Sequence, residues 1–137
     1  MQFSDKAALS KIRFDKAKDC LKAARMMLDT QDYLFASNRS YYAVFHAMRA
    51  VLVYDDFDSK KHSGIIAEFR KRYIKTGVFE EKISKIIGNQ FDMRAHSDYD
   101  DFYVVSKNVT TTQVENAGKV FDIIVPYIMD SISDTEE

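Results

Sequence analysis

The sequence of 137 residues contains one proline, four glycines, one cysteine and no tryptophan. Folds of many short strands need glycine and proline in their turns, so this scarcity argues against them. The single cysteine, Cys20, has no partner for a disulfide, and its place on an apolar helical stripe predicts a reduced, buried thiol in a cytoplasmic protein. No stretch approaches 18 uninterrupted apolar residues, and residues 1–11 lack the apolar segment of a signal peptide. We therefore expect neither a membrane span nor an export signal.

The charge balance narrows the function classes. The net charge is −1, with 46% hydrophobic and 30% charged residues, which is ordinary globular usage. Nothing attracts the whole chain to nucleic acid or an anionic membrane, so such binding would need a local patch. The length predicts one domain over residues 1–137, with its core at about 5–130 and a frayed acidic end at 130–137.

Apolar residues recur at three- and four-residue steps along most of the chain, which predicts helices. The sequence predicts an all-α fold, an up-and-down helical bundle of four long helices with a short fifth helix inserted. The expected segments are 4–29, a second helix containing 37–52, a short helix at 63–75, a fourth from 79–81 onward, and a last from 112.

Several residues mark the expected ends of these helices. Asp32 can cap the second helix, and Gly77 is a suitable stop for the short one. Residues 98–109 are expected to form an irregular or extended connection. Thr112–Glu115 matches a capping box that would open the last helix, in which Pro126 should cause a kink.

The segment Ser37–Leu52 is two-sided. On a helix, Arg39, Tyr42 and His46 share one side. Asn38 and Arg49 lie at the margin of that side, and the opposite side carries Leu34, Tyr41, Val44, Phe45, Met48 and Leu52. An apolar face with a narrow polar strip predicts a central helix whose polar side chains meet partners.

A second polar stretch begins at Asp92. If the fourth helix continues through it, Arg94 and Asp98 prolong its inner face, while His96 points roughly the other way. We expect Arg94 and Asp98 to meet the polar groups of the second helix, which are Asn38, Arg39, Tyr42 and His46. A buried guanidinium needs a carboxylate nearby, and Asp98 is the nearest candidate.

Two interpretations of this polar cluster stay open. A buried network of Arg, Asp, Tyr and His can fix how helices dock and do nothing more. Alternatively, Arg94 binds a phosphate while a nearby His or Tyr acts as acid or base, which would suffice for RNA cleavage without a metal. Spacing alone does not decide between them.

Other patterns are weaker. His46, His62 and His96 are too dispersed for a metal site, and we expect no metal and no cofactor. The segment from Lys60 to Lys75 is locally basic and could touch phosphates, but a solvated helix face is the more common explanation of such a pattern.

Three segments in order, SNRSYYAVFHAMRAVL at 37–52, KKHSGIIAEFRKRYIKTGVF at 60–79 and MRAHSDYDD at 93–101, resemble the HEPN domain. The likeness is to the stand-alone prokaryotic branch of this family of higher eukaryote and prokaryote nucleotide-binding domains. It covers about residues 5–130. The resemblance implies a helical bundle that forms a homodimer and is often encoded beside a small nucleotidyltransferase as a toxin–antitoxin pair.

Many members of this family are metal-independent ribonucleases that use an arginine followed, after four to six residues, by a histidine. Here the fifth and sixth residues after Arg94 are Tyr99 and Asp100, so no histidine stands at the expected place. Arg94, Asp98 and Tyr99 instead match an R-x-x-x-D-Y pattern of members that need not be nucleases.

The resemblance favours a homodimeric nucleotide- or RNA-binding component that works with a nucleotidyltransferase. Its polar site would comprise Asn38, Arg39, Tyr42, His46, Arg94, Asp98 and Tyr99. One alternative is a metal-independent endoribonuclease toxin with a non-standard motif, in which Arg94 acts with His96, His46 or Tyr99. A second is a structural interaction dimer without a ligand. Tyr99 could also accept a nucleotidyl group from the partner enzyme.

Overall fold

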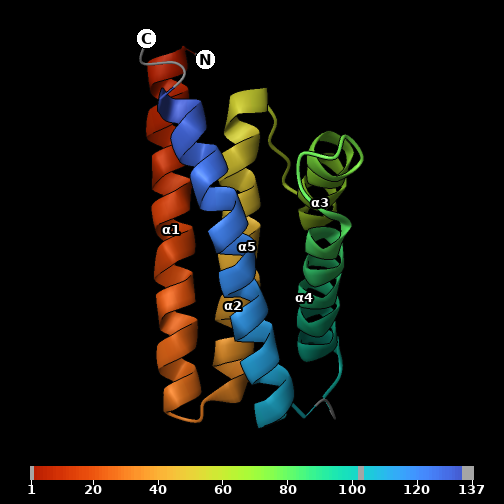
Figure 1. Ribbon diagram of the computed structural model, residues 1–137. Helices are drawn as coiled ribbons and strands as arrows, with labels where there is room; N and C mark the ends of the chain where they lie inside the picture. Colours follow the sequence, from red (N-terminus) through yellow and green to blue (C-terminus); the bar gives the residue numbers. More distant parts are fainter. Residues whose placement is uncertain (1, 102–103, 134–137) are drawn as a thin grey trace.

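The computed structural model describes residues 2–101 and 104–133. Its elements in that part of the chain, none of them a strand, are α1 (Phe3–Asp29), α2 (Tyr33–Leu52), η1 (Val53–Asp55), α3 (His62–Phe69), η2 (Arg70–Ile74), α4 (Glu81–Tyr99) and α5 (Lys107–Ser133). Figure 1 shows α1 and α4 running toward one end of the bundle and α2 and α5 toward the other. The predicted all-α bundle of four long helices and one short helix is confirmed.

Helix α2 is the centre of the bundle. It contacts each of the other four α-helices. Its apolar side chains pack with those of α3, α4 and α5 in a core that includes Val44, Met48, Leu52, Ile65, Phe69, Ile83, Ile87 and Ile124. The predicted central helix is therefore confirmed, except that Leu34, in its first turn at the end of the bundle, is 47% exposed.

The turn between α1 and α2 is closed by backbone groups. The N–H of Asp32 donates to the carbonyl oxygen of Met27 at 2.8 Å, and Gln31 has a positive φ of 64°. Asp32 occupies the cap position of α2, but its side chain makes no capping hydrogen bond. The prediction of a side-chain cap there is wrong, because the short connection turns back through its own backbone.

The short helix is less regular than predicted. Helix α3 ends at Phe69, and η2 continues it as one π-helical turn. Gly77, with φ of 79°, then donates from its N–H to the carbonyl oxygen of Ile74 at 3.0 Å. This confirms Gly77 as the stop, since a positive φ favours glycine.

Helices α4 and α5 extend into the predicted connection at 98–109, because α4 runs to Tyr99 and α5 begins at Lys107. The capping box at Thr112–Glu115 is wrong, since those residues lie within α5. The Oγ of Ser106 instead accepts the N–H of Val109 at 3.2 Å. The following threonine hydroxyls donate back to carbonyl oxygens one turn earlier, which lets threonine occupy a helix interior.

The last helix continues past its proline. Pro126 lies inside α5, which runs on to Ser133. Residues 134–137, the end of the predicted acidic tail, lie outside the described residues. Among the helices that the structure describes, none combines the length and apolar composition needed to span a membrane.

Candidate functional site

Side chains from α2, α3 and α4 meet in an aromatic cluster. Tyr41, Tyr42 and Phe45 come from α2, His62 is the first residue of α3, and Arg94 comes from α4. The His62 ring stacks on Phe45 with centroids 4.1 Å apart. The rings of Tyr41 and Tyr42 meet edge to face at 5.1 Å. We refer to these five residues as the His62–Arg94 cluster.

The hydrogen bonds of the cluster converge on one nitrogen. The hydroxyl of Tyr41 lies 2.7 Å from Nδ1 of His62, and Nη1 of Arg94 lies 3.3 Å from the same atom. A guanidinium can only donate, so Nδ1 must accept and therefore carries no proton. It follows that the proton of the neutral imidazole is on Nε2.

Electrostatics support this assignment. Burial raises the pKa of Tyr41 to about 12, so its hydroxyl stays protonated and can donate to His62 at neutral pH. Burial, followed by the positive charges of Arg94 and Arg49, lowers the pKa of His62 below its usual value. The imidazole of His62 is therefore neutral at pH 7, with Nε2–H as a fixed donor.

The His62 ring also lines a pocket of about 560 Å³ whose other walls include Arg49, Asp58 and Lys60. The guanidinium of Arg49 pairs with Asp58 at 3.0 Å, and Arg13 pairs with the same carboxylate at 3.1 Å. One carboxylate thus pairs with two arginines, and Lys60 adds a third positive side chain to the pocket. The pocket and its rim, which we call the basic pocket, keep an excess of positive charge.

Arg94 is held by charge and by aromatic rings. Its Nη2 lies 3.4 Å from the carboxylate of Asp98, which is 39% exposed. The guanidinium lies 5.2 Å from the centroid of the Tyr41 ring and 5.6 Å from that of Tyr42. Its Nε is buried and has no hydrogen-bond partner in the described part of the chain. Arg94 therefore meets Tyr42 as predicted, and it also reaches Tyr41 and His62.

The polar residues Asn38 and Arg39 of α2 are linked to the cluster through the ring of Tyr42. Arg39 packs over the Tyr42 ring at 5.1 Å and donates to Oδ1 of Asn38 at 2.8 Å. It also reaches Sγ of Cys20, which is buried as predicted, at 3.8 Å. This group joins the His62–Arg94 cluster through Tyr42 and donates no hydrogen bond to His62.

The ring of His46 lies 6.0 Å from that of Tyr42. Burial first, and then the positive charges of Arg49, Lys16 and Arg39, lower the pKa of His46 to about 4. Its Nδ1 is buried without a hydrogen-bond partner among the described residues. His46 is therefore a neutral neighbour of the cluster at pH 7.

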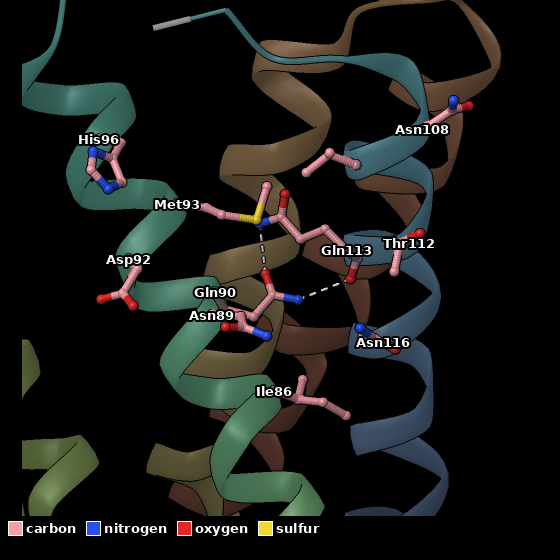
Figure 2. Close-up of a pocket in the computed structure, with 11 residues that line it drawn as sticks. Ile86, Asn89, Gln90, Asp92, Met93, His96, Asn108, Thr112, Gln113 and Asn116 are labelled. Carbon is pink, nitrogen blue, oxygen red and sulfur yellow. Dashed lines mark hydrogen bonds between the residues drawn. The ribbon is translucent and has the colours of Figure 1, made fainter.

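One of the predicted catalytic residues, His96, does not join the cluster. His96 lines a pocket between α4 and α5 (Figure 2), and Arg94 is not among the residues that line this pocket. Tyr99 is the last residue of α4, and its side chain lies outside the described residues. Among the described residues, no group of three His, Cys, Asp or Glu side chains could hold a metal ion.

Sequence reasoning missed His62 as a site residue. It treated this histidine as one of three dispersed rings and as part of a basic helix face. The available signal was its place in the segment KKHSG, which opens the third helix of the HEPN-like pattern.

The HEPN domain model matches residues 10–128, which include α2, α3 and α4 in full. The chain belongs to the HEPN family. It is 29% identical over 115 residues to a UPF0332 protein of Thermotoga maritima, covering 84% of this chain and 87% of the relative. It is 31% identical over 107 residues to a Methanocaldococcus jannaschii protein named "Putative toxin MJ0142", covering 78% of this chain and 72% of that relative. A second protein of that organism, "Putative toxin MJ0605", is 34% identical over 83 residues, 61% of this chain and 62% of its own.

Proposed function

We propose that this HEPN protein is a homodimeric nucleotide- or RNA-binding component of a two-gene, toxin–antitoxin-like system in which a nucleotidyltransferase is the partner. The observation that supports binding most directly is the neutral His62. Its Nδ1 accepts from Tyr41 and Arg94, which leaves Nε2–H as an oriented donor beside the basic pocket. The word toxin in the names of two relatives supports the two-gene context.

The basic pocket has the chemistry that a phosphate needs. Arg49 and Lys60 supply positive charge, and His62 supplies a neutral N–H donor whose orientation is fixed. Charge-assisted hydrogen bonds from such groups to phosphate oxygens are among the stronger ones in proteins. A volume of about 560 Å³ is within the range of sites for small ligands and nucleotides.

The geometry favours binding over RNA cleavage. A general base must offer a lone pair, but the lone pair of neutral His62 is on Nδ1 and is occupied by Tyr41 and Arg94. His46, with a pKa of about 4, is poorly matched to proton transfer at neutral pH. We therefore favour nucleotide or RNA binding over metal-independent ribonuclease activity as the function. The expected assay result is no cleavage of an RNA pool without metal, by the wild type or by Arg94→Ala.

Phosphate binding is tested with a fluorescent single-stranded RNA and the folded full-length protein. Lys60→Ala and His62→Gln should each weaken RNA binding several-fold. Lys60→Ala should also reduce the magnitude of the slope of log affinity against log salt concentration by about 1, because one phosphate contact is lost. Lys119→Ala, which removes an exposed lysine from α5, is the matched control and should change neither. Affinity that is unchanged in both test variants would refute the proposed site.

The dimer and the partner need separate measurements. Light scattering on the purified protein should give twice the mass of one chain, and co-expression with the adjacent gene product should yield a co-purifying complex. A monomer at all accessible concentrations, or a neighbouring nucleotidyltransferase that never co-purifies, would contradict this part of the proposal.

A further inference from the structure

A second pocket lies between α4 and α5 (Figure 2), and Arg94 does not line it. Its volume is about 460 Å³. Ile86, Met93 and Val109 give it apolar walls, and three asparagines, Asn89, Asn108 and Asn116, also line it. Asp92 and His96 also line it, and no lysine or arginine does, so it suits a flat, polar-edged ligand that can donate hydrogen bonds rather than a phosphate. We call it the amide pocket.

A buried network lies behind this pocket and fixes the orientation of one amide. Nε2 of Gln113 donates to Oε1 of Gln90 at 2.7 Å and to the carbonyl oxygen of Ser37 at 3.1 Å. Nε2 of Gln90 donates in turn to the main-chain carbonyl oxygen of Gln113 at 2.9 Å. Because Ser37 offers a carbonyl oxygen, which can only accept, the Gln113 amide cannot be reversed without losing a donor.

This orientation leaves one acceptor unused. Oε1 of Gln113 is buried and has no hydrogen-bond partner in the described part of the chain. Figure 2 shows this oxygen directed away from Gln90, on the side where the Met93 side chain lies. A buried acceptor without a donor costs about 1–3 kcal/mol, so a ligand that supplied an N–H would recover much of that free energy.

The oxygen is shielded from solvent, so a ligand must displace part of the pocket lining to reach it. Met93 is half-buried and lines the pocket beside Gln113. Its unbranched thioether has three rotatable bonds and adapts to different neighbours at little cost. A rotamer change of Met93 would open the path.

We propose that the amide pocket binds a nucleobase with an exocyclic amino group, of which adenine is the best fit. The apolar side chains hold the faces of the ring, and the amino group donates to Oε1 of Gln113. The pocket asparagines bond the ring nitrogens, since amide side chains match the edge of adenine with one donor and one acceptor. This site uses none of the residues of the His62–Arg94 cluster or the basic pocket.

The test compares adenosine with purine riboside, which has the same ring system and sugar but lacks the amino group. Titrating each into the full-length protein, followed by calorimetry and by the methyl signal of Met93, should show adenosine binding roughly tenfold more tightly, which is about 1.4 kcal/mol. Equal affinities, or no binding of adenosine, would overturn the proposal.

Two variants locate the site. Val109 is 51% exposed, so Val109→Trp should fill the pocket without disturbing the core and should abolish adenosine binding. Asn116→Leu keeps the side-chain size, removes one amide and should weaken adenosine binding. If the pocket is instead covered by a second copy of the chain, adenosine will not bind and Val109→Trp will shift the oligomeric state, which refutes the nucleobase assignment.

A third variant separates this proposal from the one above. Lys60→Ala should weaken RNA binding through the basic pocket and leave adenosine affinity unchanged. A parallel loss of both affinities would place adenosine in the basic pocket and contradict the amide pocket as its site.

Discussion

The hydroxyl of Tyr41 lies 2.7 Å from Nδ1 of His62 and so ties the buried centre of α2 to the first turn of α3. Tyr41 is 2% exposed, which makes it a rigid anchor. Because Arg94 donates to the same nitrogen, residues 41, 62 and 94 act together to hold one imidazole tautomer. The Nε2–H donor that we assign to phosphate binding is a consequence of this arrangement.

Tyr41→Phe should uncouple this anchor. The variant keeps the ring and loses the hydroxyl, so the free energy of unfolding should fall by about 1 kcal/mol in urea denaturation. RNA affinity should also fall, because His62 is then held by Arg94 alone. Tyr42→Phe is the control, since Tyr42 makes ring contacts in the cluster but no hydrogen bond to His62. Equal effects of the two variants would contradict the role of the Tyr41 hydroxyl.

Arg94→Ala should cost modest stability. Its partner Asp98 is 39% exposed, so removal of Arg94 does not leave a buried charge, and the expected loss is about 1–2 kcal/mol from packing on the two tyrosine rings and a partly solvated ion pair. The pKa of His62 should rise, because a positive neighbour is removed. NMR titration of the His62 ring measures the second effect. A pKa that falls, or an unfolding loss of several kcal/mol, would show that Arg94 serves a different role.

His46 should make stability depend on pH. Its pKa is about 4 in the folded state and near 6.5 in the unfolded state, so the unfolded chain binds more protons between these values. The neutral ring's contribution is present above about pH 6.5 and is lost as the pH falls toward 4. After allowance for partial exposure, the loss is about 2 kcal/mol.

The matched variant for this prediction is His46→Leu, which should flatten the stability profile between pH 4 and about 6.5. It should cost little at pH 7, because Nδ1 of His46 has no hydrogen-bond partner among the described residues. If the free energy of unfolding of His46→Leu depends on pH as steeply as that of the wild type, His46 is not the source of the pH dependence.

The buried amides should behave as a coupled pair. Gln90→Leu removes one acceptor from Nε2 of Gln113 and one donor from the main-chain carbonyl oxygen of Gln113. The free energy of unfolding should therefore fall by about 2–3 kcal/mol. The double variant Gln90→Leu/Gln113→Leu should lose less than the sum of the two single variants, since removing both partners leaves fewer unpaired groups. Strict additivity in urea unfolding would show that the amides do not interact.

Much of the fold could be predicted because helical periodicity is a local signal. The apolar stripes gave five helices in the right order, and the two-sided pattern of residues 37–52 identified the central helix. The errors occurred at helix ends. Thr112–Glu115 has the residue types of a capping box, but Oγ of Ser106 accepts a first-turn N–H of α5 instead. The residue pattern alone could not decide which of the two positions begins the helix.

The site was only partly predictable because it depends on contacts between distant segments. Arg94 and Tyr42 were paired correctly by their helix faces, since both faces could be read from periodicity. His62 was missed because it comes from a third element, and its position depends on the loop that precedes α3. Its contacts with Tyr41, 21 residues earlier, and Arg94, 32 residues later, leave no local pattern.

The most direct test of phosphate binding is the pKa of His62, measured by NMR with and without adenosine monophosphate. A phosphate held at Nε2–H favours the protonated ring, so the pKa of His62 should rise and its Nε2 signal should shift. Adenosine, which lacks the phosphate, should leave His62 unchanged, and Lys60→Ala should reduce the effect of the nucleotide. A His62 ring with the same pKa and signals at high concentrations of adenosine monophosphate would contradict the account.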